Sequence, residues 1–151
     1  MSTQAVELAA FARLMRAHTV LRRELQAEVL SPRALTINDF EALLHLSKAD
    51  DNRLRRVDLV ELLMLTPSGV TRLLEGLQEA GLVENVQCDD DARVTWARLT
   101  PDGIETVQCV GASHARRLRE LFHDALSEGE VEQLSELLGK LPRVGAGSCV
   151  G

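Results

Sequence analysis

The chain has 151 residues, of which 45% are hydrophobic and only 3% aromatic, so we expect one domain with a mostly aliphatic core. Its formal net charge of −6 argues against a nucleic-acid partner, because nucleic-acid-binding domains are usually basic. The sequence has no apolar run of about 18 residues and no basic segment followed by an apolar run at its start. We therefore expect a cytoplasmic protein with no secretion signal and no membrane span.

Catalytic and metal-binding motifs are absent from the sequence. Cys88, Cys109 and Cys149 form no CxxC pair and no zinc-type cluster, so neither a disulfide framework nor a metal or other cofactor is expected. There is no Gly-rich phosphate loop, no GxSxG and no HExxH. Ser113 and His114 are adjacent in a predicted helix and point in different directions, so they form no catalytic dyad. We expect no enzymatic activity.

The first predicted element is a long helix over residues 4–30. Apolar residues recur there near helical spacing, and the segment contains neither glycine nor proline. Ser31 and Pro32 are expected to end this helix.

A second helix is predicted to begin after Thr36, because Thr36 and Asp39 form an acidic variant of the capping box. Residues 48–52 are polar and predict a turn, and a short third helix is predicted over residues 56–63. Because only two residues separate that helix from the next helix cap, the pair predicts a helix-turn-helix.

Residues 65–82 predict one helix with two different faces. Thr66 is a candidate N-cap, Pro67 suits the first helical position, and Gly81 can take the left-handed conformation that ends a helix. One face is apolar and suits a core, with Val70, Leu73, Leu74 and Leu77. The opposite face is polar, with Ser68, Thr71, Arg72 and Glu75. A face of this kind can approach a phosphate or the floor of a major groove, and an ordinary solvated face is the alternative.

The period then changes, and residues 82–87 and 94–99 predict two strands of a β-hairpin. Residues 99–103 repeat the Leu-Thr-Pro-x-Gly form of residues 65–69, so another helix is predicted to begin at Pro101 and to run to about residue 126. A Ser-x-x-Glu capping box at Ser127 starts the last predicted helix. The tail, residues 143–151, has no periodicity and is expected to be flexible.

The segment 35–103 resembles the winged helix-turn-helix core of the MarR family of bacterial transcriptional regulators. The resemblance rests on VTRLLEGLQEAGLV, on the Asp-x-Arg pair Asp91 and Arg93 in DDDARVTWARLTPDG, and on the Leu-Thr-Pro-x-Gly form that follows. It implies a mainly α fold with a small β-hairpin wing. It also implies a single MarR-like domain over residues 1–151, with dimerisation helices at 4–30 and 104–141.

The resemblance implies a sequence-specific DNA-binding regulator, commonly a repressor, that binds a pseudo-palindromic double-stranded operator as a homodimer. The helix after Thr66 would enter the major groove. Arg93 would reach the minor groove, where negative potential is strong, and Asp91 would hold the wing loop in shape. Candidate contacts with bases and phosphates are Pro67, Ser68, Thr71 and Arg72, with Arg55 and Arg56 as candidates for backbone phosphates. The alternatives are solvated arginines and, for the wing pair, a surface ion pair without function.

The resemblance further implies release from the operator by a small, aromatic or phenolic effector held between the dimer helices and the winged core. Arg16, His18 and His45 are candidate partners for its carboxylate or phenolate. One alternative is a redox-responsive regulator in which Cys88 or Cys109 is oxidised. Another is a winged dimeric interaction module that does not bind DNA. The charge balance suits that module, because residues 53–98 hold six arginines against eight acids, a local net of −2.

Overall fold

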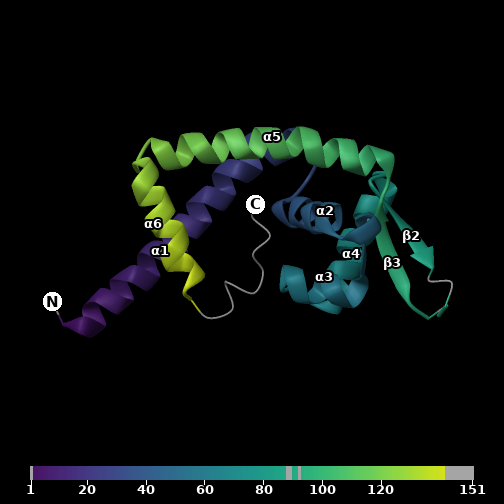
Figure 1. Ribbon diagram of the computed structural model, residues 1–151, viewed down its shortest axis with the longest axis horizontal. Helices are drawn as coiled ribbons and strands as arrows, with labels where there is room; N and C mark the ends of the chain where they lie inside the picture. Colours follow the sequence, from purple (N-terminus) through teal and green to yellow (C-terminus); the bar gives the residue numbers. More distant parts are fainter. Residues whose placement is uncertain (1, 88–89, 92, 142–151) are drawn as a thin grey trace.

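The computed structural model describes residues 2–87, 90–91 and 93–141, and Figure 1 shows a winged head at one end of the molecule, from which long helices extend. The head comprises α2 (Ile37–Lys48), β1 (Arg53–Arg55), α3 (Arg56–Leu63), α4 (Pro67–Glu79), β2 (Val83–Gln87) and β3 (Thr95–Leu99). The arms are α1 (Thr3–Leu25), α5 (Pro101–His123) and α6 (Glu128–Gly139). In Figure 1, α5 runs away from the head along the top of the view, and α6 turns down from its far end, while the start of α1 lies furthest from the head. The predicted fold class is confirmed.

The predicted helix over residues 4–30 is helical throughout but changes type near its end. The α-helix stops at Leu25, and Gln26–Leu30 (η1) form a π-helical segment. The residues expected to end the helix, Ser31 and Pro32, lie in a short 3-10 turn, Ser31–Arg33 (η2). A π-helical turn carries one residue more per hydrogen-bonded ring than an α-helical turn, so the backbone widens here.

The widened segment brings the side-chain amide of Gln26 over the start of α2. Its Nε2 donates to the carbonyl oxygen of Leu35 at 2.8 Å, and its Oε1 accepts from the backbone N–H of Ile37 at 3.1 Å. One side chain therefore satisfies a donor of the α2 N-terminus and a carbonyl of a buried residue.

An ion-pair cluster holds the same segment against α5. Arg117 of α5 lies 3.0 Å from Glu24 and 2.7 Å from Glu28, and it also bonds to Glu120 one turn further along α5 at 3.1 Å. The arms and the junction with the head are thus connected through one guanidinium.

The predicted helix caps are all present. In each cap a hydroxyl accepts from the backbone N–H three residues ahead: Thr36 from Asp39, Thr66 from Gly69, Thr100 from Gly103 and Ser127 from Glu130. The predicted start of α5 at Pro101 is confirmed, and the helix ends at His123, three residues earlier than expected.

The sheet has three antiparallel strands in the order β1-β3-β2, so the prediction of a two-stranded hairpin was incomplete. In β1, Arg53 lies opposite Arg98 and Arg55 lies opposite Trp96 of β3. The predicted turn at residues 48–52 contains a 3-10 turn, Asp50–Asn52 (η3), which leads directly into β1. The wing is therefore attached to the start of α3 through β1.

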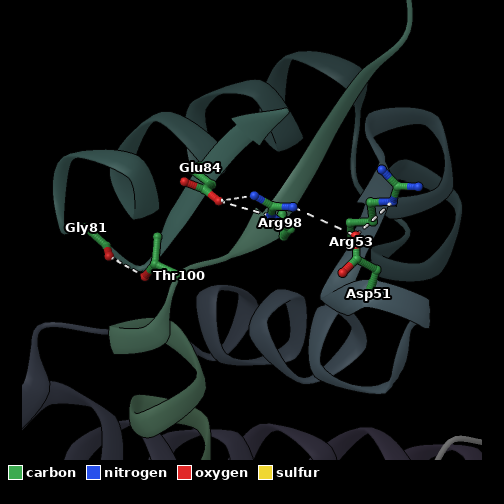
Figure 2. Close-up of polar contacts among 6 residues, drawn as sticks. All are labelled: Asp51, Arg53, Gly81, Glu84, Arg98 and Thr100. Carbon is green, nitrogen blue, oxygen red and sulfur yellow. Dashed lines mark hydrogen bonds and ion pairs between the residues drawn. The ribbon is translucent and has the colours of Figure 1, made fainter. Parts of the chain in front are cut away.

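Two glycines are required where the sheet joins its neighbouring helices. Gly81 ends α4 with a φ of +74°, a left-handed conformation that glycine adopts without steric cost. A Cβ on Gly103 would overlap the carbonyl oxygen of Leu82, so only glycine fits there. The hydroxyl of Thr100 donates to the carbonyl oxygen of Gly81 at 2.6 Å, as Figure 2 shows. The entry to the sheet and the exit from it are therefore fixed to each other.

The buried apolar core lies in the head and at its junction with the arms. In the described ranges the buried residues fall between Leu25 and Val110, and α6 contributes none. Large apolar side chains are exposed along the arms and just after α6, namely Val6, Leu8, Phe11, Met15, Val20, Leu137 and Leu141, and in the head at Val57, Leu62 and Met64. None of the helices in the described part is both long and apolar enough to cross a membrane. The predicted tail, residues 143–151, lies outside the described residues.

Candidate nucleic-acid interface

The helix α4 has the two faces that the sequence predicted. Val70, Leu74 and Leu77 are buried and Leu73 is half-buried, so one face packs into the core of the head. The polar face is exposed at its start, with Pro67, Ser68, Arg72 and Glu75. Helix N-termini favour anions, so the exposed start of α4 suits an approach to phosphate or to base edges.

Thr71 differs from its neighbours on this face because it is half-buried and bonded to α3. Nη1 of Arg56 donates to its hydroxyl oxygen at 3.2 Å. The Nε of Arg56 is also buried and has no hydrogen-bond partner among the described residues. The guanidinium of Arg56, a predicted phosphate contact, is therefore held between the two helices of the helix-turn-helix. Sequence reasoning missed this contact, which joins residues 15 positions apart.

Arg55, the other predicted phosphate contact, is exposed at the start of α3. Its guanidinium donates two hydrogen bonds to Asp58, at 3.0 and 2.9 Å, and the same carboxylate accepts from its backbone N–H at 3.3 Å. The side-chain hydrogen bonds from Arg55 hold the pKa of Asp58 below its usual range. Asp58 therefore stays ionised, orients Arg55 and offsets part of its charge.

The wing arginine, Arg93, is almost fully exposed, with 94% of its side chain accessible. Its backbone N–H donates to Oδ1 of Asp91 at 3.0 Å, while its Nε lies 3.7 Å from the same oxygen. The carboxylate of Asp91 thus contacts the backbone of the loop more closely than the guanidinium. The side chain of Arg93 can extend away from the wing.

Arginines from two distant segments line one hollow of about 290 Å³. Arg55 and Arg56 come from the start of α3, and Arg93 comes from the wing. The other lining residues, Val57, Val94 and Thr95, carry no charge. The hollow is cationic and has the chemistry to hold a phosphate-like anion.

Two other arginines of the head form ion pairs beside and on the sheet, as Figure 2 shows. Arg98 of β3 donates to Glu84 of β2 at 3.0 and 2.8 Å and lies 3.8 Å from Asp51. Arg53 of β1 lies 3.6 Å from the same aspartate, and its guanidinium stacks 4.8 Å from the ring centre of Trp96. The charges of Glu84 and Asp51 are thus offset by Arg98 and Arg53 on the sheet. Neither acid lines the cationic hollow.

The predicted effector residues lie in separate environments. Arg16 and His18 are exposed on α1, whereas His45 of α2 is half-buried. Burial lowers the pKa of His45, with Glu41 opposing and Lys48 adding to the shift, so its imidazole is neutral at pH 7. None of these three residues lines either of the hollows described in this section.

A second hollow of about 380 Å³ lies where the arms meet the head. It is lined by Arg33, Leu35, Ala80, Leu82, Glu105, Thr106, Cys109 and Val110. Cys109 is exposed, and Nη2 of Arg33 lies 3.9 Å from its sulfur. Cys88, the other cysteine considered for redox sensing, lies outside the described residues. In the described ranges no group of three or more histidines, cysteines or acids could hold a metal ion.

Known proteins share this arrangement. A sequence profile of the MarR family matches residues 35–94. The HTH-type transcriptional regulator MhqR of Bacillus subtilis (strain 168) is 29% identical over 79 residues, which are 52% of this chain and 54% of that regulator. The matched region thus spans about half the length of that relative.

Solved structures match over nearly the whole chain. Sco5413, a MarR family transcriptional regulator from Streptomyces coelicolor, is 30% identical with a TM-score of 0.80, covering 93% of this chain and 95% of that one. A mutant of MarR from E. coli, complexed with operator DNA, is 26% identical with a TM-score of 0.76, covering 92% and 98%. Because the similarity extends over the winged head and the helices on both sides of it, the chain belongs to the MarR family of transcriptional regulators.

Proposed function

We propose that this protein is a homodimeric, sequence-specific DNA-binding regulator, of repressor type, that binds a pseudo-palindromic operator through α4. The observation that carries the proposal is the two-sided α4, whose apolar face is buried while its first turn is exposed. The similar MarR mutant from E. coli was solved with operator DNA, which supports the same partner for this chain. Because that partner is chromosomal DNA, we place its action in the cytoplasm.

In the major groove, the start of α4 would contact bases and phosphates. Pro67 and Ser68 carry little bulk, so the helix can approach the groove floor closely. Arg72 is exposed on the next turn and has no hydrogen bond or ion pair among the described residues, so it can donate to a guanine edge or a phosphate.

The wing would supply the contacts outside the major groove. Arg93 extends from the wing and suits the negative potential of a narrow minor groove. Asp91, through its bond to the backbone N–H of Arg93, would keep that loop in one conformation. Arg55, oriented by Asp58 at the edge of the cationic hollow, would contact a backbone phosphate.

The arms support the dimer in this proposal. Apolar side chains exposed along α1 and α6 have no core of their own to cover them within the described chain. Contiguous exposed apolar surface marks an interface. A second copy packed on the arms would place two winged heads on half-sites roughly 34–36 Å apart.

Regulation by a small ligand completes the proposal. An aromatic or phenolic effector between the arms and the head would release the operator by binding one spacing of the heads better than another. Arg16, His18 and His45 are its candidate partners. A neutral His45 suits a hydrogen bond with a phenol better than an ion pair with a carboxylate.

The test is a selection of bound duplexes from a random DNA pool with the full-length protein, followed by a screen for small molecules that release the selected duplex. We expect the enriched sequences to share an inverted repeat, and a small aromatic or phenolic compound to shift the complex toward free DNA. If the protein enriches no sequence, DNA binding is wrong. The winged interaction module that does not bind DNA then becomes the better description.

A further inference from the structure

Thr71 is the residue of the proposed reading face whose hydroxyl is already engaged by another element. Its neighbours on α4, Ser68 and Arg72, are exposed, whereas Thr71 is half-buried and receives a hydrogen bond from Arg56. The hydroxyl of Ser68 lies 3.2 Å from Oγ1 of Thr66, and either group can donate. The Ser68 hydroxyl is therefore not fixed as a donor or as an acceptor. The two hydroxyls of this face are therefore not equivalent.

The contact between Arg56 and Thr71 determines which way the hydroxyl can act. A guanidinium only donates hydrogen bonds, so Nη1 of Arg56 must use a lone pair of Oγ1 of Thr71. The hydroxyl hydrogen of Thr71 has no acceptor among the described residues, including the carbonyl of Pro67 one turn earlier, which threonine in a helix often uses. That hydrogen is available to an outside acceptor.

The position of Arg56 makes the Thr71 hydroxyl a stronger hydrogen-bond donor. Its Nε is buried without a partner in the described part of the chain and its Nη1 is bonded to Thr71, so the guanidinium is held against α4 even though Arg56 also lines the cationic hollow. A cation beside a hydroxyl oxygen makes the O–H group a better donor and a weaker acceptor, since hydrogen-bonded groups polarise one another. The same bond also favours one of the two side-chain rotamers that threonine adopts in helices.

We propose that Arg56 acts through Thr71, by fixing the Thr71 hydroxyl as a donor toward the major groove. This inference rests on the DNA binding proposed above. In the major groove guanine presents the acceptors N7 and O6, thymine presents O4, and adenine presents N7 beside its amino donor, whereas cytosine presents only an amino donor. A donating hydroxyl therefore discriminates against cytosine, and favours guanine or thymine over it, at the position that Thr71 faces. Arg56 is a positioning residue for base readout and does not contact a phosphate.

This role differs measurably from a phosphate contact. An arginine that neutralises a phosphate contributes to binding at every sequence and adds about one to the dependence of log K on log salt concentration. A residue that only orients Thr71 changes the preference at one base pair of each half-site and leaves the salt dependence unchanged. Arg55, the exposed neighbour of Arg56, provides the matched comparison because it is expected to contact a phosphate.

The experiment uses the full-length wild type and the variants Thr71→Val, Arg56→Met and their combination. After selection from a random duplex pool, affinities are measured for the selected duplex and for duplexes changed at each position in turn. At one position per half-site we expect wild type to prefer guanine or thymine over cytosine. Thr71→Val and Arg56→Met each lose about three- to tenfold of this preference at the same position, as one hydrogen bond contributes. The double variant loses no more than either single variant.

The salt dependence is measured in parallel. Arg56→Met is expected to keep the wild-type slope, whereas Arg55→Met lowers it by about one. If Arg56→Met weakens all duplexes equally and lowers the slope, Arg56 contacts a phosphate and the inference is wrong. It is equally wrong if Thr71→Val keeps every base preference of the wild type.

Two further results keep the outcome decisive. Thr71→Ser retains the hydroxyl and is expected to restore the guanine or thymine preference that Thr71→Val loses. This pair tests the donor role even if Arg56→Met does not fold, which thermal unfolding would reveal. A wild-type protein that selects no DNA removes the proposed function and this inference together, whereas a selective wild type with unchanged variants removes only the inference.

Discussion

Of the arginines in the proposed interface, Arg72 and Arg93 make the weakest contacts with the rest of the protein. Arg72 has no hydrogen bond or ion pair among the described residues, and Arg93 approaches Asp91 only to 3.7 Å with 94% of its side chain accessible. By contrast, Arg98 lies 2.8 Å from Glu84 of β2, and Arg53 lies 3.6 Å from Asp51 of η3. Arg72 and Arg93 can therefore reach DNA without breaking a strong contact inside the head.

We expect Arg72→Ala and Arg93→Ala each to weaken binding to the selected operator by about 1–3 kcal/mol. The reason is the loss of one groove contact from each half-site. An electrophoretic shift titration measures the effect. Arg119→Ala is the control, because Arg119 is exposed on α5 and has no hydrogen bond or ion pair in the described part of the chain. Wild-type affinity in both interface variants would exclude this mode of recognition.

His114 makes the stability of the protein depend on pH. Its ring packs edge-on against Phe40 with the ring centres 5.0 Å apart, and burial lowers its pKa. Below about pH 6.5 the unfolded chain therefore binds a proton that the folded chain resists, so the free energy of unfolding falls as the pH drops. The loss is complete once the folded imidazole is also protonated. His45, whose pKa is lowered too, contributes in the same direction.

We therefore expect His114→Leu to lose less stability than wild type between about pH 7.5 and about pH 5.5. Urea unfolding at each pH measures the difference. His123→Gln, at an exposed position of the same helix, serves as the matched control. An equal loss of stability in wild type and His114→Leu would show that His114 does not cause the pH dependence.

At the scale of elements, α4 and α5 begin with the same Leu-Thr-Pro-x-Gly form but place their glycines in different surroundings. A Cβ on Gly69 would lie 3.1 Å from Oγ1 of Thr66, the end of a side chain. A Cβ on Gly103 would overlap the backbone carbonyl oxygen of Leu82, which is fixed by the sheet. Although the two caps share one sequence form, the backbone of the sheet requires glycine at position 103, whereas only a side chain lies close at position 69.

We expect Gly103→Ala to lower the free energy of unfolding by about 1–3 kcal/mol, because the backbone must move to admit the methyl group. Gly69→Ala is expected to change stability by less than about 1 kcal/mol, since a tight contact offsets the better helix propensity of alanine. Denaturant unfolding of the two variants gives the comparison. Equal losses would show that the close approach at Gly103 is not what requires glycine.

The sequence predicted the helices of the head well because each start depends on residues three positions apart. A cap such as Thr36 with Asp39 can be seen in the sequence directly. β1 could not be predicted, because three residues have no usable periodicity and their partner strand lies about forty residues later. The change to a π-helix at Gln26 also has no local signal, because its side chain bonds to residues nine and eleven positions ahead.

The same limit applies to the proposed site. Asp91 and Arg93 belong to a motif, so their place on the wing could be predicted from the sequence alone. The cationic hollow could not, because it requires the wing to return to the start of α3 through β1. Nor could the bond between Arg56 and Thr71, which depends on how closely α3 packs against α4.

At the scale of the whole molecule, the exposed apolar stripe of α1 predicts dimerisation. Leu8 and Phe11 are each 63% exposed, and Met15 lies one turn further on the same side. We expect wild type to sediment as a dimer. Replacing both Leu8 and Phe11 with glutamate should raise the dissociation constant by about a hundredfold or more, since each buried side chain contributes about 1.5–3 kcal/mol.

Arg13→Glu provides the control for added negative charge, because Arg13 lies on the opposite side of α1. It is expected to leave the dimer intact. A Leu8→Glu, Phe11→Glu variant that sediments like wild type would show that the stripe does not form the interface.

The π-helical turn between α1 and α2 also sets the angle at which each arm leaves its head. Each residue of an α-helix advances by about 100° around the axis. Inserting one alanine after His18 of α1, between the apolar side chains Leu8, Phe11 and Met15 and the π-helical turn, would rotate that apolar side by about that angle relative to the head. In the proposed dimer both heads would keep their internal structure, yet they would be out of phase with the turns of the double helix. In that case the arms would determine the spacing between the two half-sites, and the heads would separately determine which bases are recognised.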